Sequence, residues 1–569
     1  MKKLYILLIG LLAGMGTLQA QEPEKNDAVL DRTVVVENLY NPDIMNANKI
    51  SLLPTLDEPQ INKKQIEYAT STKPAGQFNF APMGSFGVTP QQTDAKDGYL
   101  RFGYGNRGNI DGRLAYRLEW KKRDVLNVNV ALRGMDGVVK LPETIEKNNE
   151  WDIRTYRTQG SVDWEHKFDL HTLAVEADVE NQVFNYMNFS PWIDNTHQHN
   201  VLGSVNAVFG HNDADAEIWY RVGTGLLYAK QKYAFGYYDA DKSESYAETI
   251  IRSHVHVKGD IDEVNSVHLF AQMDNIFLNP GGRYNGASQT VIQLNPYLVS
   301  YGDKWNARVG MHLDPIFGSG GAEVAFAPDL YGEYNITKGY TAYVQVGGGR
   351  VLNDFRAINR FDPYAEFPVY GKDSKGEGYY TPKHAFHQLD SRIGFKASPF
   401  NEVAMHAYVG FGKIKNQLFS IYREDYSYGR LNQLMQDDAK RFYVGASVQG
   451  SWKDYLTTQA TFEWNKWTCD LLDKYSTLTP EISFQWVANI YPIEKLNVEL
   501  KYQFQQYRKD VNGNRFDAMN NVGINASYRF LNWLSAYVQS DNLLNSKYYQ
   551  YLMLPAQGIN VLGGVVLDF

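Results

Sequence analysis

The chain has 569 residues, of which 44% are hydrophobic, 14% aromatic and 21% charged, and its formal net charge is −8. This acidic balance, without any dense lysine or arginine run, excludes the basic footprint of a nucleic-acid-binding protein, and we expect no nucleic-acid partner. Cys469 is the only cysteine, so no internal disulfide can stabilise the chain.

Residues 1–20 have the features of a secretory signal peptide. Lys2 and Lys3 give a positive start, and an apolar stretch from Leu4 to Leu18 follows that is too short to span a membrane as a helix. We expect cleavage after Ala20, although Leu18 is larger than the residue usual at its position and leaves other cut sites open. The sequence therefore predicts an exported protein.

Residues 21–96 form a separate N-terminal segment. Its part from 37 to 75 is rich in turn residues and has no long periodic pattern, so it is not expected to build a core of its own. We expect this segment to lie in the periplasm or inside the lumen of the domain that follows.

From about residue 97 the sequence alternates between apolar and polar residues, which places them on opposite faces of β-strands. No later stretch of eighteen or more apolar residues predicts a membrane-spanning helix. A soluble β-sandwich also alternates, but a membrane barrel fits better. The clearest runs of apolar positions are Leu126, Val128, Val130 and Leu132; Leu456, Thr458, Ala460, Phe462 and Trp464; Leu496, Val498, Leu500, Tyr502 and Phe504; and Val522, Ile524, Ala526, Tyr528 and Phe530.

The connections between these strands are of two kinds, as in outer-membrane barrels with short inner turns and long outer loops. Longer aromatic-rich stretches at 183–198, 351–382 and 419–437 are predicted to lie on the outer surface. Ten turns imply roughly 22 strands, to within two to four, in an all-β transmembrane antiparallel barrel over residues 97–569. The short turns are predicted around Lys122, Phe168, Asn212, Asp260, Asp303, Thr337, Phe400, Lys453, Pro492 and Leu531.

The last predicted strand ends on an aromatic residue. Its alternating positions include Val565, Leu567 and Phe569, a pattern typical of terminal strands that the barrel-assembly machinery recognises. Together with the signal peptide and an aromatic content suited to interface girdles, this strand predicts the outer membrane of a Gram-negative-type bacterium. Outer-membrane lipids would then surround the barrel.

Residues 540–549 (SDNLLNSKYY), residues 554–558 (LPAQG) and the final strand together resemble the C-terminal end of TonB-dependent receptors. Leu544 replaces the aromatic residue usual in that motif, and Gln557 stands where arginine is frequent. The resemblance covers roughly thirty residues, and it implies a barrel of about 22 strands that takes part in import.

The N-terminal segment departs from that family. Its receptors carry a globular plug that is longer than residues 21–96, and the plug's strand motifs are absent, so a barrel without a full plug is expected. Because a lumen of this width would be leaky, we expect the N-terminal segment, inward-folded loops or a partner protein to occupy it. Thr33, Val34, Val35 and Val36 resemble a TonB box, which pairs with an energising protein by strand addition, but they are also simply a good strand sequence.

The sequence contains none of the common hydrolase, phosphate-loop or metalloenzyme motifs, so no enzymatic activity, cofactor or metal site is predicted. Two histidine pairs, His197 with His199 and His254 with His256, each share a strand face and could bind a metal, although ordinary polar positions explain them better. They are expected at opposite rims. Loop aromatics could stack on a flat ligand or simply pack: Phe184, Tyr186, Phe189, Trp192, Phe361, Tyr364, Phe367, Tyr370, Tyr379 and Tyr380.

Two functions remain open at this point. The first is a transport-type barrel for the passage or import of an unidentified solute, with a surface lipoprotein or a TonB-like protein as candidate partners. The second is a non-transporting structural subunit of an outer-membrane assembly, secretion or surface-protein complex.

Overall fold

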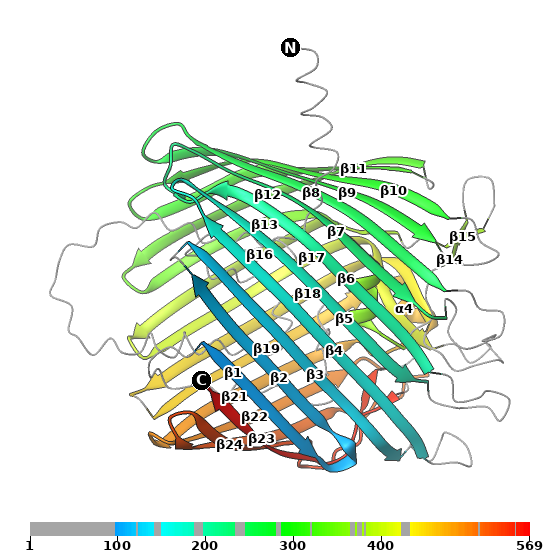
Figure 1. Cartoon of the computed structure of the whole chain (residues 1–569). Helices are drawn as coiled ribbons and strands as arrows, with labels where there is room; N and C mark the ends of the chain where they lie inside the picture. Colours follow the sequence, from blue (N-terminus) through cyan, green and yellow to red (C-terminus); the bar gives the residue numbers. More distant parts are fainter. Residues whose placement is uncertain are drawn as a thin grey trace.

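A computed structural model of the chain describes residues 97–569 (Figure 1). Short gaps in this description lie at 121–122, 141–149, 187–196, 234–244, 280–285, 319–320, 365–369, 373–377, 381–382, 423–432, 454, 510–511 and 552–553.

Twenty-two antiparallel strands form a closed barrel, which confirms the predicted fold class and strand number. The first half of the ring consists of β1 (Gly98–Gly105), β2 (Ile110–Trp120), β3 (Asp124–Lys140), β4 (Glu150–Lys167), β5 (His171–Asn185), β6 (His197–His211), β7 (Ile218–Gln231), β8 (Tyr246–Asp260), β9 (Asn265–Asn279), β10 (Ala287–Tyr301) and β11 (Trp305–Gly318). The second half consists of β12 (Gly321–Thr337), β13 (Tyr340–Val351), β16 (Ala385–Phe400), β17 (Val403–Tyr422), β18 (Gln433–Trp452), β19 (Leu456–Thr468), β21 (Pro480–Ile493), β22 (Leu496–Tyr507), β23 (Met519–Leu531), β24 (Leu534–Asp541) and β27 (Asn560–Asp568).

The ring closes where the first strand meets the last. Strand β1 pairs with β2 on one side and with β27 on the other, from Tyr99 opposite Asp568 to Gly105 opposite Leu562. Closure leaves no unpaired sheet edge, which a barrel in lipid requires because the bilayer offers no hydrogen-bond partners. Both described ends therefore lie at the same rim (Figure 1).

The ten predicted short turns are confirmed, and all of them lie at that rim. Each predicted position falls in, or within two residues of, a connection of six residues or fewer between consecutive barrel strands. All connections longer than six residues are at the opposite rim, together with the two short ones between β1 and β2 and between β11 and β12. The two rims therefore correspond to the inner and outer sides that the sequence predicts.

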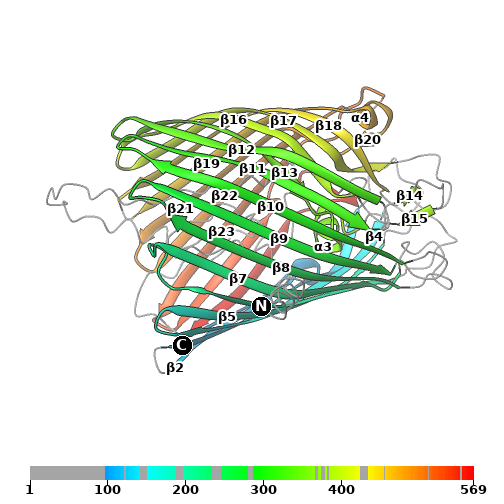
Figure 2. The ribbon, with the colours of Figure 1, turned by 90° about the horizontal axis from the view of Figure 1, so that it is seen from above.

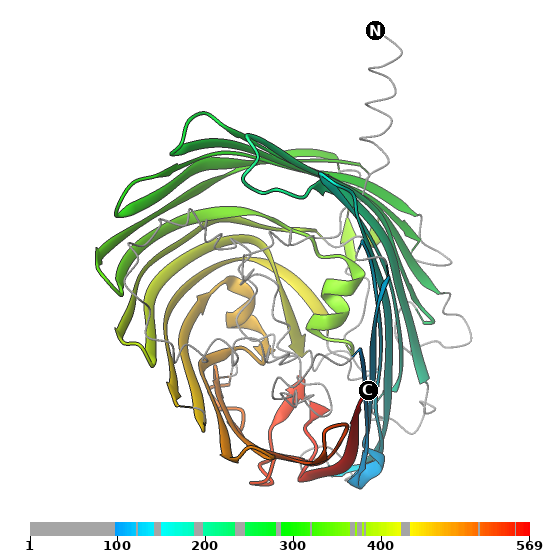
Figure 3. The ribbon, with the colours of Figure 1, turned by 60° about the vertical axis from the view of Figure 1, so that its left-hand side comes forward.

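The bounds of the predicted outer loops need correction. Residues 419–422 and 433–437 belong to strands β17 and β18, and residues 183–185 and 197–198 belong to β5 and β6. The reason is that antiparallel pairing between these neighbouring strands continues beyond the predicted loop bounds. The rest of the 419–437 loop and the centre of the 183–198 loop lie outside the described residues. The third stretch, 351–382, differs more, since its described part from 352 to 364 turns into the barrel (Figure 3).

The two faces of the barrel wall have opposite character. On the outside, large apolar side chains such as Val205, Val309 and Phe326 are more than half exposed, as a lipid-facing surface requires. The positions between such outward residues point to the lumen and are small or polar, among them the buried Asn206 next to Val205 and the buried Ala327 next to Phe326. No helix among the described residues combines the length and the apolar character that a bilayer crossing requires.

Several short elements lie outside the ring of barrel strands. They are η2 (Asn106–Gly108), α3 (Phe355–Phe361), β14 (Tyr370–Lys372), β15 (Gly378–Tyr380), α4 (Asp470–Lys474), β20 (Ser476–Thr477), β25 (Tyr549–Tyr551) and β26 (Leu554–Pro555). Helices α3 and α4 both belong to connections at the outer rim (Figure 2).

Candidate functional site: a lumen crossed by an inward-folded loop

Residues 352–364, here called the strap, leave the end of β13 and enter the lumen as the helix α3. Asp354 caps this helix, because its side chain accepts a hydrogen bond from the Ala357 amide at 2.7 Å. Phe355, Ile358 and Phe361 follow at a spacing of three, which places them on one side of a short helix. Figure 3 shows α3, in yellow-green, within the ring of strands.

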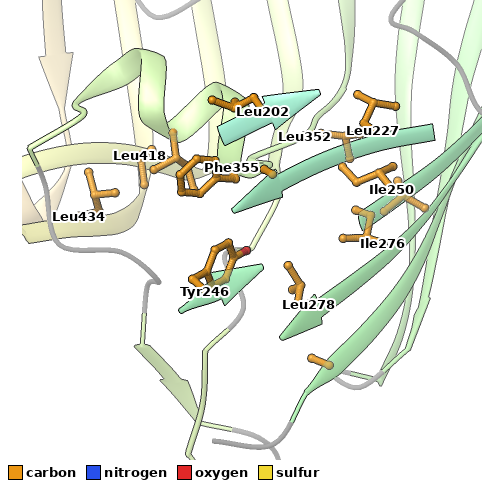
Figure 4. Packing of buried hydrophobic residues seen from close by; sticks show 14 residues of the cluster. Leu202, Leu227, Tyr246, Ile250, Ile276, Leu278, Leu352, Phe355, Leu418 and Leu434 are labelled. Atoms are coloured by element: carbon orange, nitrogen blue, oxygen red, sulfur yellow. The ribbon is translucent and has the colours of Figure 1, made fainter. Parts of the chain in front are cut away.

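The apolar side of the strap joins strands from distant parts of the wall (Figure 4). Leu352, Phe355 and Ile358 are buried in one cluster that contains Leu202 of β6 and Leu434 of β18. Strand β6 is the sixth of the 22 in the ring and β18 the sixteenth, so these two strands lie almost opposite each other. Each buried apolar side chain of the strap stabilises its docking by about 1.5–3 kcal/mol.

Polar contacts fix the strap to β5 and β6. Arg356 forms an ion pair with Asp178, with 3.2 Å between Nη1 and Oδ2. The Asn359 side chain donates to Gln182 Oε1 at 2.8 Å and accepts from Asn200 Nδ2 at 3.0 Å. The strap is therefore held in one position by directional contacts as well as by its apolar side.

A second set of contacts joins the strap to β8. The Phe355 amide donates to both carboxylate oxygens of Glu248, at 3.0 and 3.2 Å, and the Tyr246 hydroxyl also donates to Glu248. Arg252 forms a close ion pair with Asp274 of β9 and lies 3.8 Å from Asp354 of the strap. The first turn of α3 is thus held on a lumen-facing carboxyl group.

The remaining strap contacts reach β17 and the start of β16. Ser420 donates to Asp362 at 2.7 Å, and the Asn353 amide donates to Nδ1 of His384 at 3.1 Å. Burial, with a smaller contribution from cationic Arg350, lowers the pKa of His384 from its ordinary value of 6.5 to about 3. His384 is therefore neutral in this structure and can accept from the strap.

Two other outer connections cover the neighbouring part of the mouth. Tyr364, at the end of the strap, packs against Trp151, Phe184 and Tyr551, the last of which lies in the connection from β24 to β27. This burial raises the pKa of Tyr364 well above its ordinary value. In the connection from β19 to β21, Leu471 and Leu472 of α4 pack on Phe419 and Ile421 of β17, and β20 pairs with the same strand.

The residues that resemble the receptor motif build the seam of the barrel. Asn542 adopts a positive φ of 50°, and its side chain donates to the carbonyl oxygens of Ser546 and Gln557. Gln557 in turn lies 3.4 Å from Asn109 Nδ2, next to η2. These polar side chains provide hydrogen bonds in the connection from β24 to β27, the strand that pairs with β1.

The predicted histidine pairs lie on opposite faces. His197 and His199 are on the outer face of β6, since their neighbours Gln198 and Asn200 are the ones buried toward the lumen. His254 and His256 are buried on the lumen side of β8, where His256 lies 3.3 Å from His268. No group of three or more histidine, cysteine, aspartate or glutamate side chains suited to a metal ion occurs among the described residues.

The predicted loop aromatics are placed only in part. Phe184, Tyr186 and Tyr364 come together in one buried cluster, so packing explains them, and Phe361 packs on the apolar cluster of the strap. Phe189, Trp192 and Phe367 lie outside the described residues, as do the TonB-box-like residues Thr33, Val34, Val35 and Val36. Tyr370 belongs to β14, and Tyr379 and Tyr380 to β15.

The terminal strand has the predicted geometry. Val565 and Phe569 are exposed on the outer face, Leu567 lies on the same face, and Leu562 and Val566 point inward and are buried. The site that sequence reasoning missed is the strap itself. Its signal was present, because an aspartate precedes three apolar residues at helical spacing inside a stretch interpreted as an outer loop.

This chain resembles known proteins in fold and not in sequence. No family model matches the chain, and no curated protein matches it in sequence. Three solved structures illustrate the similarity in fold, each aligned over 84% of this chain. They are the ferric-catecholate import receptor Fiu from K12 E. coli (11% identity, TM-score 0.61, 82% of that chain), the FrpB iron transporter from Neisseria meningitidis (F3-3 variant; 10%, 0.65, 82%) and the siderophore receptor PirA from Acinetobacter baumannii (10%, 0.64, 81%).

The barrel resembles those of TonB-dependent receptors. This confirms the resemblance that the C-terminal residues indicate. At such low identity the likeness concerns the fold, and the function has to be argued from this chain's own residues.

Proposed function

We propose that this protein is an import-type barrel of the Gram-negative outer membrane, which passes a solute through its lumen when the strap moves. The observation that carries the proposal is the strap, which crosses the lumen from β13 and binds strands on opposite sides of the ring. A barrel of this width needs a barrier in its lumen, and a barrier built from a loop, not from barrel strands, can move to let a solute pass. The names of the structural neighbours, which include an import receptor and an iron transporter, support the same class of function.

The strap would act as the barrier at the outer half of the lumen. Its apolar side chains and its contacts with Asp178, Gln182, Asn200 and Glu248 must all separate before a solute can pass. Because the strap belongs to the connection between β13 and β16 and not to a barrel strand, it can move without disturbing the strands. Loop movement of this kind is common in gated sites.

A test compares the full chain with a variant in which residues 355–361 are replaced by a Gly-Ser linker of equal length. Both proteins are reconstituted into vesicles that contain a self-quenched dye, and dye release is measured. We expect the linker variant to release the dye much faster than the unmodified chain. Equal release from both would show that the strap is not the barrier.

We further propose that residues 21–96 act on the periplasmic side or in the lumen, and that Thr33, Val34, Val35 and Val36 pair with a TonB-like protein by strand addition. The barrel fold common to energised receptors supports this role. Val35→Pro removes a backbone donor and should abolish co-purification of such a partner. Retention of the partner by this variant would reject the role of the segment.

The terminal strand is proposed to be the recognition element for the barrel-assembly machinery, through Val565, Leu567 and Phe569. Their position on one outward face of the last strand supports the proposal, since an assembly factor can contact this face before β27 pairs with β1 and the ring closes. Phe569→Ser should lower the amount of folded barrel in the outer membrane. A control substitution on the same strand, Gly563→Ala, should not.

The alternative is a structural subunit of an outer-membrane assembly, secretion or surface-protein complex. The extensive contacts of the strap favour it to some degree, because a permanently closed lumen fits a protein that transports nothing. Mild solubilisation and mass spectrometry of co-purifying proteins separates the two proposals. A surface lipoprotein or a TonB-like protein alone supports import, whereas several assembly or secretion components support the alternative.

A further inference from the structure

The wall beneath the strap is rich in hydrogen-bond acceptors. Asp178 and Glu248 both receive their strap contacts as acceptors, from the Arg356 guanidinium and from the Phe355 amide. The nearby carboxylates of Glu180 and Asp274 already have cationic partners in the wall, Arg157 and Arg252. When the strap leaves, Asp178 loses its cationic partner and Glu248 loses the amide donor, although Ser204 and Tyr246 still donate to them.

Two buried amide oxygens at the same place have no partner in the described part of the chain, even when the strap is docked. Asn200 is 1% exposed and Gln231 is 3% exposed, and these two residues are opposite each other on β6 and β7. Neither Asn200 Oδ1 nor Gln231 Oε1 has a hydrogen-bond donor among the described residues. A buried acceptor without a donor is costly, by about 1–3 kcal/mol, so these oxygens are places where a ligand N–H group would bind.

The orientation of the Asn200 amide is fixed by a chain of contacts. Gln182 uses its NH₂ group on Glu180, so its oxygen faces Asn359, which donates to it. The Asn359 oxygen then faces Asn200 and accepts a hydrogen bond from the NH₂ group of Asn200. The Asn200 oxygen is therefore the atom that remains free.

The strap itself is an imperfect ligand for this wall. Arg356 binds Asp178 through Nη1, while its Nε and Nη2 atoms are buried and have no hydrogen-bond partner among the residues that the structure describes. A guanidinium that donates two parallel hydrogen bonds to a carboxylate binds it more tightly than a guanidinium that donates one. A separate molecule with the same groups can therefore compete with the strap.

We propose that the strap occupies the binding site of a basic oligopeptide, one with an arginine next to apolar residues, and that such a peptide enters the lumen by displacing the strap. The arginine binds Asp178, peptide N–H groups bind Glu248 and the free oxygens of Asn200 and Gln231, and the apolar residues fill the cluster of Leu202, Leu227 and Ile250. This inference deepens the proposed import function by naming its class of cargo. It also predicts that anionic ligands bind poorly, because the exposed wall carries two carboxyl groups.

The test measures peptide binding in detergent, separately from passage through a membrane. The probe is a fluorescently labelled synthetic peptide of residues 355–361, which carries two arginines and no acidic residue. The protein is the full chain carrying Arg356→Glu, which turns the strap contact with Asp178 into a repulsion. We expect this variant to bind the probe at least roughly tenfold more tightly than the unmodified chain does, as loss of one charge-assisted contact by the strap implies. Binding is read as fluorescence anisotropy.

Two controls show whether the site is the one proposed. Asp178→Asn in the Arg356→Glu background should weaken probe binding roughly tenfold, whereas Glu463→Gln, which removes a lumen-facing carboxylate on β19, should leave it unchanged. A probe with both arginines changed to glutamate should not bind. A second strap variant, Phe355→Ala with Ile358→Ala, gives the same comparison if Arg356→Glu does not fold.

The inference is overturned if neither strap variant binds the basic probe, or if the glutamate probe binds equally well. Binding without any solute passage in vesicles would contradict the import proposal and leave the peptide site in place. If the linker variant passes dye but neither strap variant binds the peptide, the peptide site is rejected and the import proposal is kept.

Discussion

Asn359 and Gln182 are 177 residues apart in the chain, yet the side chain of the first donates a 2.8 Å hydrogen bond to the side chain of the second inside the lumen. This contact joins a loop that leaves β13 to the wall at β5, on another side of the ring. It is the most direct sign that the strap has a defined docked position.

The amide of Asn359 should be needed for that docked position. Asn359→Leu keeps a similar volume but leaves Gln182 and Asn200 without their partner, and each unpaired buried amide costs about 1–3 kcal/mol. Hydrogen exchange of residues 352–364 should become markedly faster. Unchanged exchange would mean that these contacts do not hold the strap.

Phe355 should contribute more to docking than Phe361 does. Phe355 is 2% exposed and stacks on Tyr246 at 5.6 Å, whereas Phe361 is only partly buried at the edge of the cluster. Phe355→Ala should weaken docking by about 3–5 kcal/mol, and Phe361→Ala by clearly less. Limited proteolysis of the strap measures both, and equal cleavage of the two variants would contradict this ranking.

Docking of the strap should weaken in acid because of His384. Its pKa is lowered to about 3 when the strap is docked, compared with an ordinary value of 6.5. Between these values the released state takes up a proton that the docked state cannot, so docking loses about 1.4 kcal/mol per pH unit as the pH falls below 6.5. Stability of the docked state is thus fully present above pH 6.5.

Hydrogen exchange of the strap at about pH 7.5 and about pH 5, corrected for the intrinsic exchange rate, checks this dependence. The control is His384→Gln, which can still accept from the Asn353 amide but does not titrate. The variant should lose the acid-induced release. If it releases the strap in acid as the unmodified chain does, another group is responsible.

The seam between β1 and β27 should be sensitive at Gly98. A Cβ atom at this position would collide with the ring of Phe569, whereas a Cβ atom at Gly259 would meet nothing within 4 Å. Gly98→Val should therefore lower the temperature at which the barrel unfolds in detergent, and Gly259→Ala should not. Similar unfolding temperatures for both variants would show that the Phe569 ring moves aside without cost.

The barrel could be predicted from the sequence because its wall obeys a single local rule. Asn525 is buried toward the lumen and Ile524 is exposed to the outside, and the same alternation identifies most strands and places the ten turns between them. Strand ends were less certain, since β17 continues to Tyr422 with buried Phe419 and Ile421, where aromatic content suggested a loop.

The strap could not be placed because its partners are set by tertiary structure. Nothing near Arg356 or Asn359 in the sequence points to Asp178 or Gln182, which meet them only after the ring has closed. The capped helix could be found from Asp354 and the apolar spacing after it, but the direction in which it folds could not. The same holds for Asn200 and Gln231, whose free oxygens become evident only from the contacts around them.

The most direct test of the account is the single-channel conductance of the full chain in planar bilayers, compared with that of the variant whose residues 355–361 are replaced by a Gly-Ser linker. We predict that the unmodified chain conducts little and that the linker variant opens a large, stable conductance. A variant that conducts no more than the unmodified chain would contradict the claim that the strap closes the lumen.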